Sequence, residues 1–194
     1  MRAIDIVLSA LALLCLAPAL LLICLVVRLT SPGPALFRQV RVGRYGRPFR
    51  LLKYRTMEHG AVGPAVTERN DDRVTPVGRF LRRWKLDELP QLVNVLRGEM
   101  SLVGPRPEVP EYVAHYTDAQ REALSVRPGL TGAATLAYRN EEALLAGRED
   151  VVAYYLAEVM PAKLAIELRY LRRRSIRTDL GLLVRTAWLV LSGR

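Results

Sequence analysis

The sequence predicts an α+β protein that is mostly helical, with a membrane helix, a small β-hairpin and several amphipathic helices around one active site. Three observations support this: an uncharged run from Ile6 to Val27, two alternating apolar–polar segments, and apolar residues at helical spacing thereafter. The 194 residues suffice for one modest globular domain beside the membrane element. We therefore divide the chain into a membrane-embedded part, 1–30, and a second domain, 31–194, with interfacial C-terminal helices.

The first segment is long enough, at roughly 33 Å as a helix, to cross the apolar core of a bilayer. A cleaved signal peptide is disfavoured because the apolar run continues past Ala17-Pro18-Ala19. Pro18 bends the helix near its middle, which also permits a helix that enters one leaflet and returns. The residues alone favour simple spanning over that re-entrant form. Arginines after the segment place the rest of the chain on the cytoplasmic face; they are Arg28, Arg38, Arg41, Arg44 and Arg47.

Two short strands follow a hinge at Ser31-Pro32-Gly33-Pro34. The segments Ala35–Gly43 and Phe49–Met57 both alternate apolar and polar residues, and we expect them to pair as a hairpin. Glu58 to Asp72 is polar and contains glycine and proline, which predicts a mobile loop.

Helices are predicted for most of the remainder. Thr75 caps the first, with Pro76 at its first position, and Asp87 caps the second, which ends at Gly98. Three further helical segments are expected: Glu108–Leu124, Ala143–Leu171 as one or two helices, and Leu180–Leu191. The last follows Arg172, Arg173, Arg174 and Arg177, a pattern typical of a helix lying along lipid headgroups. An ordinary amphipathic helix that packs on its own domain has the same pattern.

The charge balance points to a polyanionic partner. The chain has 29 Lys+Arg against 19 Asp+Glu, a net charge of +10, and lysine occurs only at 53, 85 and 163. The arginine guanidinium binds phosphate in a bidentate manner, although arginines on a solvated surface would give the same composition. Both cysteines lie in the apolar segment and the two histidines are isolated, so the sequence indicates neither a disulfide framework nor a Cys/His zinc site.

Asp87 and Glu88 are the most informative residues. The default interpretation is a helix cap followed by a first-turn acid. However, Arg106 lies between two prolines in a stiff segment suited to clamping a phosphate, and Arg127 begins a second Arg-Pro turn with glycines that let backbone approach a ligand. Together these residues describe a site for a diphosphate and a divalent cation. A carboxylate there can attack phosphorus to form an acyl phosphate.

Five ordered motifs resemble the bacterial sugar transferase family, the monotopic polyprenyl-phosphate phosphoglycosyl transferases. The motifs are Phe37-Arg38-Gln39, Lys53-Tyr54-Arg55-Thr56-Met57, Leu86–Leu92, Met100–Pro107 and Val126–Gly132. The chain resembles the minimal form of the family, a catalytic domain without extra spanning helices. The resemblance implies transfer of a sugar-1-phosphate from a UDP-sugar to undecaprenyl phosphate, with release of UMP.

The resemblance also implies roles for single residues. Asp87 is the nucleophile that carries a covalent phosphosugar, and Glu88 helps it to hold Mg²⁺. Arg106 contacts phosphate, and Arg55 should lie close by. Further implied contacts come from Lys53 and Arg127 to the substrate, and acidic support comes from Glu167 and Asp179.

The chain departs from the family pattern in two places. The family's first helix is re-entrant and broken by Ser-Pro, whereas this chain has Ala17-Pro18; Pro18 remains, and the resemblance favours the re-entrant form. The family commonly continues Trp-Ala-Gln after Thr131-Gly132, but here Ala133-Ala134-Thr135 is followed by an acidic insertion through Asp150. The sequence therefore does not reveal which sugar is transferred.

The expected partners are a UDP-sugar, undecaprenyl phosphate and membrane lipids, with no nucleic acid, at the inner membrane of a bacterium. A homodimer is compatible with the sequence. The rival hypothesis is a non-catalytic, membrane-anchored protein that binds anionic lipid or nucleic acid through its arginines. That hypothesis leaves Asp87-Glu88 and the rigid Arg106 unexplained.

Overall fold

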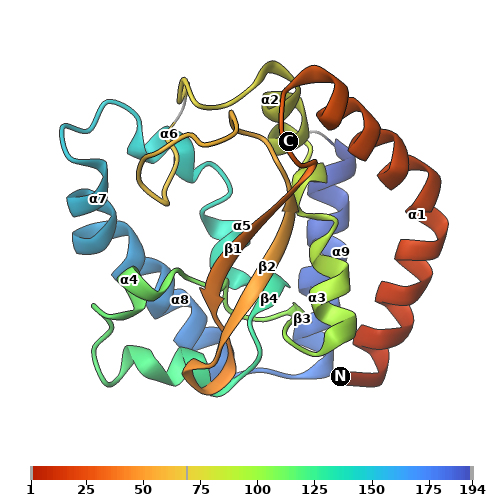
Figure 1. Ribbon diagram of the computed structural model, residues 1–194. Helices are drawn as coiled ribbons and strands as arrows, with labels where there is room; N and C mark the ends of the chain where they lie inside the picture. Colours follow the sequence, from red (N-terminus) through yellow and green to blue (C-terminus); the bar gives the residue numbers. More distant parts are fainter. Residues whose placement is uncertain (1, 69, 193–194) are drawn as a thin grey trace.

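The computed structural model describes residues 2–68 and 70–192, and its fold is the mostly helical α+β arrangement that the sequence predicts. A diagonal β-hairpin divides the molecule, with α1, α3 and α9 on one side and α4, α6, α7 and α8 on the other (Figure 1). The helices are α1 Arg2–Thr30, α2 Pro76–Arg83, α3 Gln91–Arg97, α4 Pro110–Val113, α5 Ala133–Ala137, α6 Glu141–Leu145, α7 Val151–Tyr154, α8 Met160–Arg172 and α9 Ile176–Ser192. The strands are β1 Leu36–Val42, β2 Pro48–Tyr54, β3 Ser101–Val103 and β4 Gly129–Thr131.

The predicted hairpin is confirmed. Strands β1 and β2 pair antiparallel, with Leu36 opposite Tyr54 and Val42 opposite Pro48. The second sheet joins β3 to β4 in parallel. The glycines near it allow two backbones to approach, since a Cβ on Gly129 would lie 2.1 Å from the amide nitrogen of Gly104. At Gly129 this freedom serves strand packing, where the sequence had suggested ligand approach.

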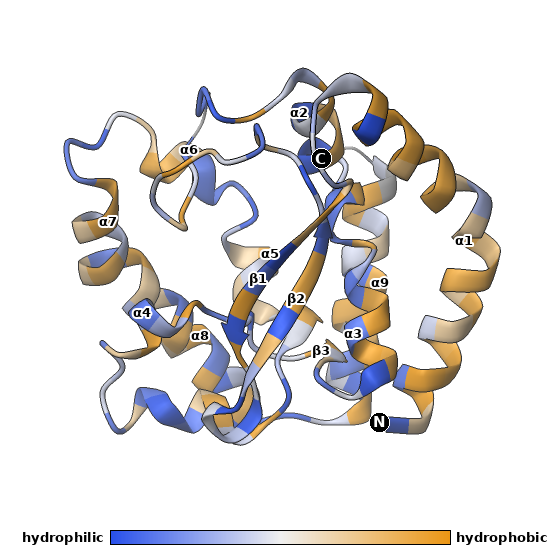
Figure 2. Ribbon diagram, viewed as in Figure 1, coloured by the Kyte–Doolittle hydropathy of each residue, from blue (hydrophilic) through white to orange (hydrophobic). Residues whose placement is uncertain are grey.

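Helix α1 lies along the side of the domain and is fastened near both ends. At its start, Asp5 accepts hydrogen bonds from the Ser101 hydroxyl (2.9 Å) and the Leu102 amide (3.1 Å). In its second half, the Tyr54 hydroxyl donates to the carbonyl of Leu20 at 2.7 Å. Its most apolar stretch has a mean hydropathy of 3.0 and is 6% buried, and Figure 2 shows this helix as predominantly hydrophobic. By length and composition, α1 could cross a membrane.

The core consists of three clusters of buried apolar side chains. One joins the α4 region to α8 and includes Tyr112, Leu145 and Tyr155. Another joins β2, α3 and β3. The third fastens the end of α1 against β2 and α2 through Val27 and Leu81, among others.

Helix starts and stops agree with the predictions in part. Thr75 caps α2, accepting from the Gly78 amide at 2.9 Å, and Gly98 ends α3 with a left-handed φ of 82°. The predicted helix over Glu108–Leu124 is wrong: α4 is short, and a separate 3-10 turn covers Gln120–Ser125. The chain restarts there because Thr117 and Gln120 exchange side-chain-to-backbone hydrogen bonds, as in a capping box.

The C-terminal helices follow the predicted plan. The segment 143–171 forms the end of α6, then α7 and α8, which are joined by a π-helical turn at Tyr155–Val159. Gly147, with φ of 71°, lies between α6 and α7. Helix α9 includes the predicted segment 180–191 and begins four residues before it, at Ile176. Arg69 of the predicted loop 58–72 lies outside the described residues.

Candidate active site

A polar cavity of about 130 Å³ contains the Asp-Glu pair. Its walls come from the hairpin, the segment joining α2 to α3, the Arg106 segment, and the region from α5 to α8. Its basic lining residues are Arg41, Lys53, Arg82, Lys85, Arg106, Arg139 and Lys163. Its acidic lining residues are Asp87, Glu88, Glu108, Glu141 and Glu142. So many cations in one small cavity suit a phosphorylated ligand.

Asp87 lies in a 3-10 turn, Leu86–Glu88, that precedes α3. The prediction that Asp87 caps a helix is wrong, because Pro90 occupies the position before α3 and no side chain caps it. Lys85 adopts a left-handed conformation (φ 55°), which turns the chain sharply out of α2. The Asp87 side chain is buried, and its Oδ1 atom has no hydrogen-bond partner in the described part of the chain. A buried oxygen without a partner is costly, so it marks a place for a ligand or ion.

The two acids of the pair have opposite electrostatic environments. Burial, and next the charge of Glu88, raises the pKa of Asp87 above its ordinary value. Burial also opposes ionisation of Glu88, but Arg106, Lys85 and Lys53 together outweigh it and lower the Glu88 pKa to about 2. The Arg106 Nη2 atom lies 2.6 Å from Glu88 Oε1. Glu88 is therefore ionised, and Arg106 balances its charge. Asp87 is the more basic carboxylate of the two and has a free oxygen.

All three lysines of the chain line this cavity. Desolvation, followed by the charge of Arg41, lowers the pKa of Lys53 to about 8. Sequence reasoning singled out Lys53 but missed Lys85 and Lys163. The signal was present, since lysine is rare in this arginine-rich chain. Lys53, Lys85 and Arg139 have no carboxylate partner within residues 2–68 and 70–192, so their charges are available to an anion.

Arg55 and Arg127 do not line the cavity. Arg55 is buried at the end of α1, where its guanidinium donates to the carbonyls of Pro32 (2.5 Å) and Ser31 (2.8 Å). Arg127 donates to the carbonyl of Gly98 at 2.9 Å, at the end of α3. The expectation that Arg55 lies close to Arg106 at the phosphates is therefore not met in this structure. Both arginines secure chain segments here.

Glu167 and Asp179 lie behind the cavity, where they fasten helices. Glu167 accepts from the Ala134 amide at 3.0 Å, and burial raises its pKa to about 7. Asp179 is fully buried, accepts from the Tyr170 hydroxyl and pairs with Arg174 at 3.2 Å. Arg174 in turn donates to the carbonyl of Val103 at 3.0 Å. Asp179 thus supports the strand that leads to Arg106.

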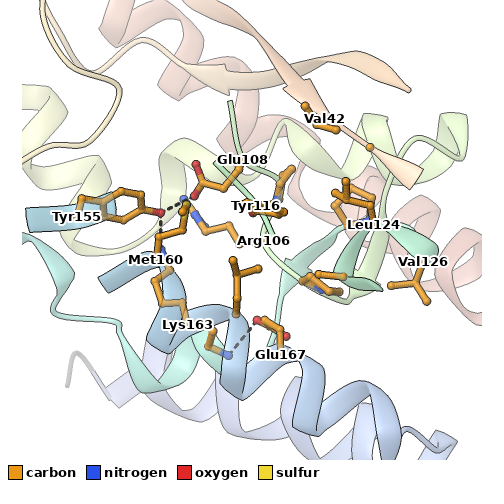
Figure 3. A pocket seen from close by; sticks show the side chains of 17 residues that line it. Val42, Arg106, Glu108, Tyr116, Leu124, Val126, Tyr155, Met160, Lys163 and Glu167 are labelled. Atoms are coloured by element: carbon orange, nitrogen blue, oxygen red, sulfur yellow. Dashed lines mark hydrogen bonds between the residues drawn. The ribbon is translucent and has the colours of Figure 1, made fainter. Parts of the chain in front are cut away.

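A second, smaller cavity of about 30 Å³ adjoins the first. Arg106, Glu108, Tyr155 and Lys163 line both cavities and form the wall between them. Figure 3 shows the residues that line the smaller cavity, among them Glu167 and Tyr155, whose hydroxyl is hydrogen-bonded to Glu108. The hydrogen bonds from Tyr155 to Glu108 (2.6 Å) and from Lys163 to Tyr155 (3.2 Å) hold the wall together.

Thr135 is a further residue of interest, because its hydroxyl is buried, lines the larger cavity and has no partner in the described part of the chain. The departure from the Trp-Ala-Gln pattern had drawn attention to this position.

A divalent cation would fit beside the pair. The described residues contain no group of three or more His, Cys, Asp or Glu side chains able to hold a metal on their own. However, Mg²⁺ is commonly bound by one or two carboxylates together with substrate phosphates. The free Oδ1 of Asp87 supplies such an oxygen, and Glu88 supplies others if Arg106 shares them.

The known proteins that this chain resembles are sugar-phosphate transferases and a protein of exopolysaccharide production. Residues 1–193 match the family model described as "Bacterial sugar transferase". The chain is 45% identical to a UDP-glucose:undecaprenyl-phosphate glucose-1-phosphate transferase of Caulobacter vibrioides, over 95% of this chain and 67% of the relative. It is 41% identical to a transferase of the same name from Escherichia coli, over 96% of this chain and 39% of that relative. An exopolysaccharide production protein, ExoY, of Sinorhizobium fredii is 35% identical, over 95% of this chain and 82% of the relative.

Proposed function

The chain belongs to the bacterial sugar transferase family, and on this premise we propose that it moves a sugar-1-phosphate from a UDP-sugar to undecaprenyl phosphate, releasing UMP. UDP-glucose is the proposed donor, because the names of the relatives from Caulobacter and Escherichia specify it. The proposed role is the first membrane step in building an exopolysaccharide or a related glycan, as the name of the Sinorhizobium relative suggests.

The observation that carries the proposal is the partnerless, buried Oδ1 of Asp87 in a cavity lined with cations. In the proposed first step, an Asp87 carboxylate oxygen attacks the phosphorus that bears the sugar. The bond from that phosphorus to the bridging oxygen breaks, and UMP leaves with this oxygen. In the second step, a phosphate oxygen of undecaprenyl phosphate attacks the same phosphorus and releases the Asp87 carboxylate. Two displacements at one phosphorus replace a single difficult transfer.

The surrounding charges suit this chemistry. The raised pKa of Asp87 makes its ionised form a stronger nucleophile, and Lys53, Lys85 and Arg139 are free to balance the donor's diphosphate. Glu88 and Arg106 form one wall of the cavity as an ion pair. Asp87 and Glu88 would also hold Mg²⁺, which, when bound, neutralises phosphate charge.

We infer that α1 is re-entrant and enters the membrane from the cytoplasmic side. A spanning helix would carry its amino end away from the domain to the opposite face of the bilayer. Instead, Asp5 is hydrogen-bonded to β3, and Leu20, in the second half of α1, is bonded to β2 through Tyr54. At the end of the apolar segment, the Val27 carbonyl accepts from the Arg55 guanidinium at 3.3 Å. Both ends of the segment therefore lie at one domain, which favours the dipping form. The membrane is, on this proposal, the bacterial inner membrane.

A panel of UDP-sugars tests the proposed function. Purified protein in lipid nanodiscs with Mg²⁺ and undecaprenyl phosphate should release UMP from UDP-glucose faster than from other UDP-sugars, and Asp87→Asn should release none while it keeps its melting temperature. The rival hypothesis, a non-catalytic protein that binds anionic lipid, predicts salt-sensitive vesicle binding without any UMP release.

A further inference from the structure

An ion pair between Arg82 and Glu142 joins two walls of the larger cavity. Arg82 belongs to the last turn of α2, and Glu142 belongs to α6, sixty positions further along the chain. The Arg82 Nε atom lies 3.1 Å from Glu142 Oε1, and Nη2 contacts the same oxygen. The Glu142 side chain is 47% exposed, whereas that of Arg82 is 19% exposed. The pair therefore lies where the cavity meets solvent, with the acid on the outer side.

The neighbouring acid, Glu141, is held much more firmly. It pairs with Lys163 at 2.6 Å, and Lys163 is buried and also donates to Tyr155. Leu145, at the other end of α6, is fully buried in the core. Loss of Glu141 would leave the buried ammonium of Lys163 without its carboxylate, which is strongly unfavourable. Helix α6 is thus anchored by Glu141 and Leu145, while Glu142 can reach water without such a penalty.

Arg82 is well placed to act on the nucleophile. Its carbonyl accepts from the Lys85 amide at 3.1 Å, inside the turn that leads to Asp87. Its guanidinium lines the cavity that holds the free Asp87 oxygen, but Glu142 already neutralises it. A diphosphate carries more negative charge than one carboxylate, so it can replace Glu142 on Arg82 with a gain in electrostatic energy.

We propose that Glu142 is an internal competitor for the donor's diphosphate: it occupies Arg82 in the free protein and releases it when a UDP-sugar binds. This inference rests on the proposed function, because it takes the cavity to be the donor site. Glu142 then swings into solvent while Glu141 keeps α6 in place. The competition lowers donor affinity and keeps other anions from Arg82 in the empty site.

UDP binding measured by isothermal titration calorimetry tests the proposal without turnover. Glu142→Gln should tighten UDP binding by roughly two- to fivefold, the size expected for removing one partly exposed ion pair. Glu149→Gln is the matched control, since Glu149 is an exposed acid near α6 that forms no ion pair with residues 2–68 or 70–192. It should leave affinity unchanged. Glu141→Gln should lower the melting temperature without tightening UDP binding.

A double-mutant cycle separates the contact from a diffuse charge effect. In an Arg82→Gln background, Glu142→Gln should no longer tighten UDP binding, because the guanidinium for which Glu142 competes is absent. Three results would overturn the proposal while UDP still binds. Glu142→Gln could tighten UDP binding equally with and without Arg82, Glu149→Gln could tighten it as much as Glu142→Gln does, or Glu142→Gln could leave UDP affinity unchanged. Wild-type protein that neither binds UDP nor releases UMP from UDP-sugars would instead refute the proposed function, and the competitor role with it.

Discussion

Asp87 and Glu88 are adjacent in sequence, yet their surroundings give them different chemistry. Arg106 lies 2.6 Å from Glu88 and keeps that carboxylate ionised, whereas burial raises the pKa of Asp87 and leaves one oxygen free. Two titratable groups whose environments push their pKa values apart are a recurring sign of divided roles. On the proposed mechanism, this division gives attack to Asp87 and charge organisation to Glu88.

The pH dependence of kcat/KM for UMP release should be bell-shaped. Activity should rise with pH as Asp87 loses its proton, at a pH above the ordinary value of 3.8 because burial raises its pKa. Activity should fall as pH passes about 8, because Lys53 then loses the positive charge that binds phosphate.

Lys53→Arg checks the alkaline limb. Arginine stays charged at all accessible pH values, so the fall near pH 8 should move upward or vanish while the acid limb stays in place. A fall near pH 8 that persists in Lys53→Arg would assign this limb to another group.

At the level of single residues, the sequence was most informative where motifs are rigid. Arg106 between two prolines and the Asp87-Glu88 pair do meet in one cavity, as predicted. Arg55 does not join them because β2 ends at Tyr54, so the alternation that turns Lys53 to the cavity does not extend to residue 55. Its guanidinium turns to the end of α1 instead, and no local sequence pattern predicts this long-range contact.

Among the elements, α8 shows how a buried acid can serve the site indirectly. Glu167 on α8 accepts from the backbone of α5, the helix that also carries Thr135 into the cavity. The pKa of Glu167 is raised from 4.5 to about 7. Its contribution to stability is therefore complete below pH 4.5, where both folded and unfolded states are protonated, and is lost as pH rises through 7.

Glu167→Gln should remove this loss. The amide oxygen can still accept from the Ala134 amide, but the side chain has no charge to bury. The melting temperature of the variant, relative to wild type, should therefore rise between pH 5 and pH 8 by on the order of 5 °C. If the melting temperatures of variant and wild type change in parallel with pH over this range, ionisation of Glu167 costs no stability, which contradicts the prediction.

The re-entrant arrangement of α1 predicts that its amino end lies on the cytoplasmic side of the membrane. With Cys15 and Cys24 replaced by alanine, a cysteine at the exposed position of Ala3 should react with an impermeant maleimide only from the cytoplasmic side. Glu111→Cys, exposed on the domain, marks that side as the control. Labelling of Ala3→Cys from the periplasmic side alone would show a spanning helix and contradict the re-entrant arrangement.

Local sequence signals predicted those elements that are marked by capping residues or by apolar–polar alternation. Thr75-Pro76 and Gly98 begin and end helices as expected, and alternation identified both strands of the hairpin. The break between α4 and the following 3-10 turn was missed, since the cap formed by Thr117 and Gln120 interrupts an apolar periodicity that continues across it. The short parallel pair β3–β4 depends on contacts between distant segments, which periodicity does not report.

For the whole molecule, the net charge of +10 indicates one kind of partner only when the fold shows where the charges lie. Arginines dominate the composition, but the three lysines, scattered along the chain, all converge on one cavity with the Asp-Glu pair. Composition alone predicted a polyanionic partner and left nucleic acid, lipid and phosphorylated substrate open. The fold favours the last, because the cations line one cavity that also contains a carboxylate with a free oxygen.

The proposed mechanism is tested most directly by whether Asp87 carries the sugar phosphate. Wild-type protein incubated with UDP-glucose and Mg²⁺, without undecaprenyl phosphate, should release UMP in a stoichiometric burst. By intact-protein mass spectrometry it should also gain the mass of one hexose phosphate, located on the peptide that contains Asp87. Asp87→Asn should show neither. If UMP appears only after undecaprenyl phosphate is added, and the protein never gains mass, transfer is direct and the covalent role of Asp87 is contradicted.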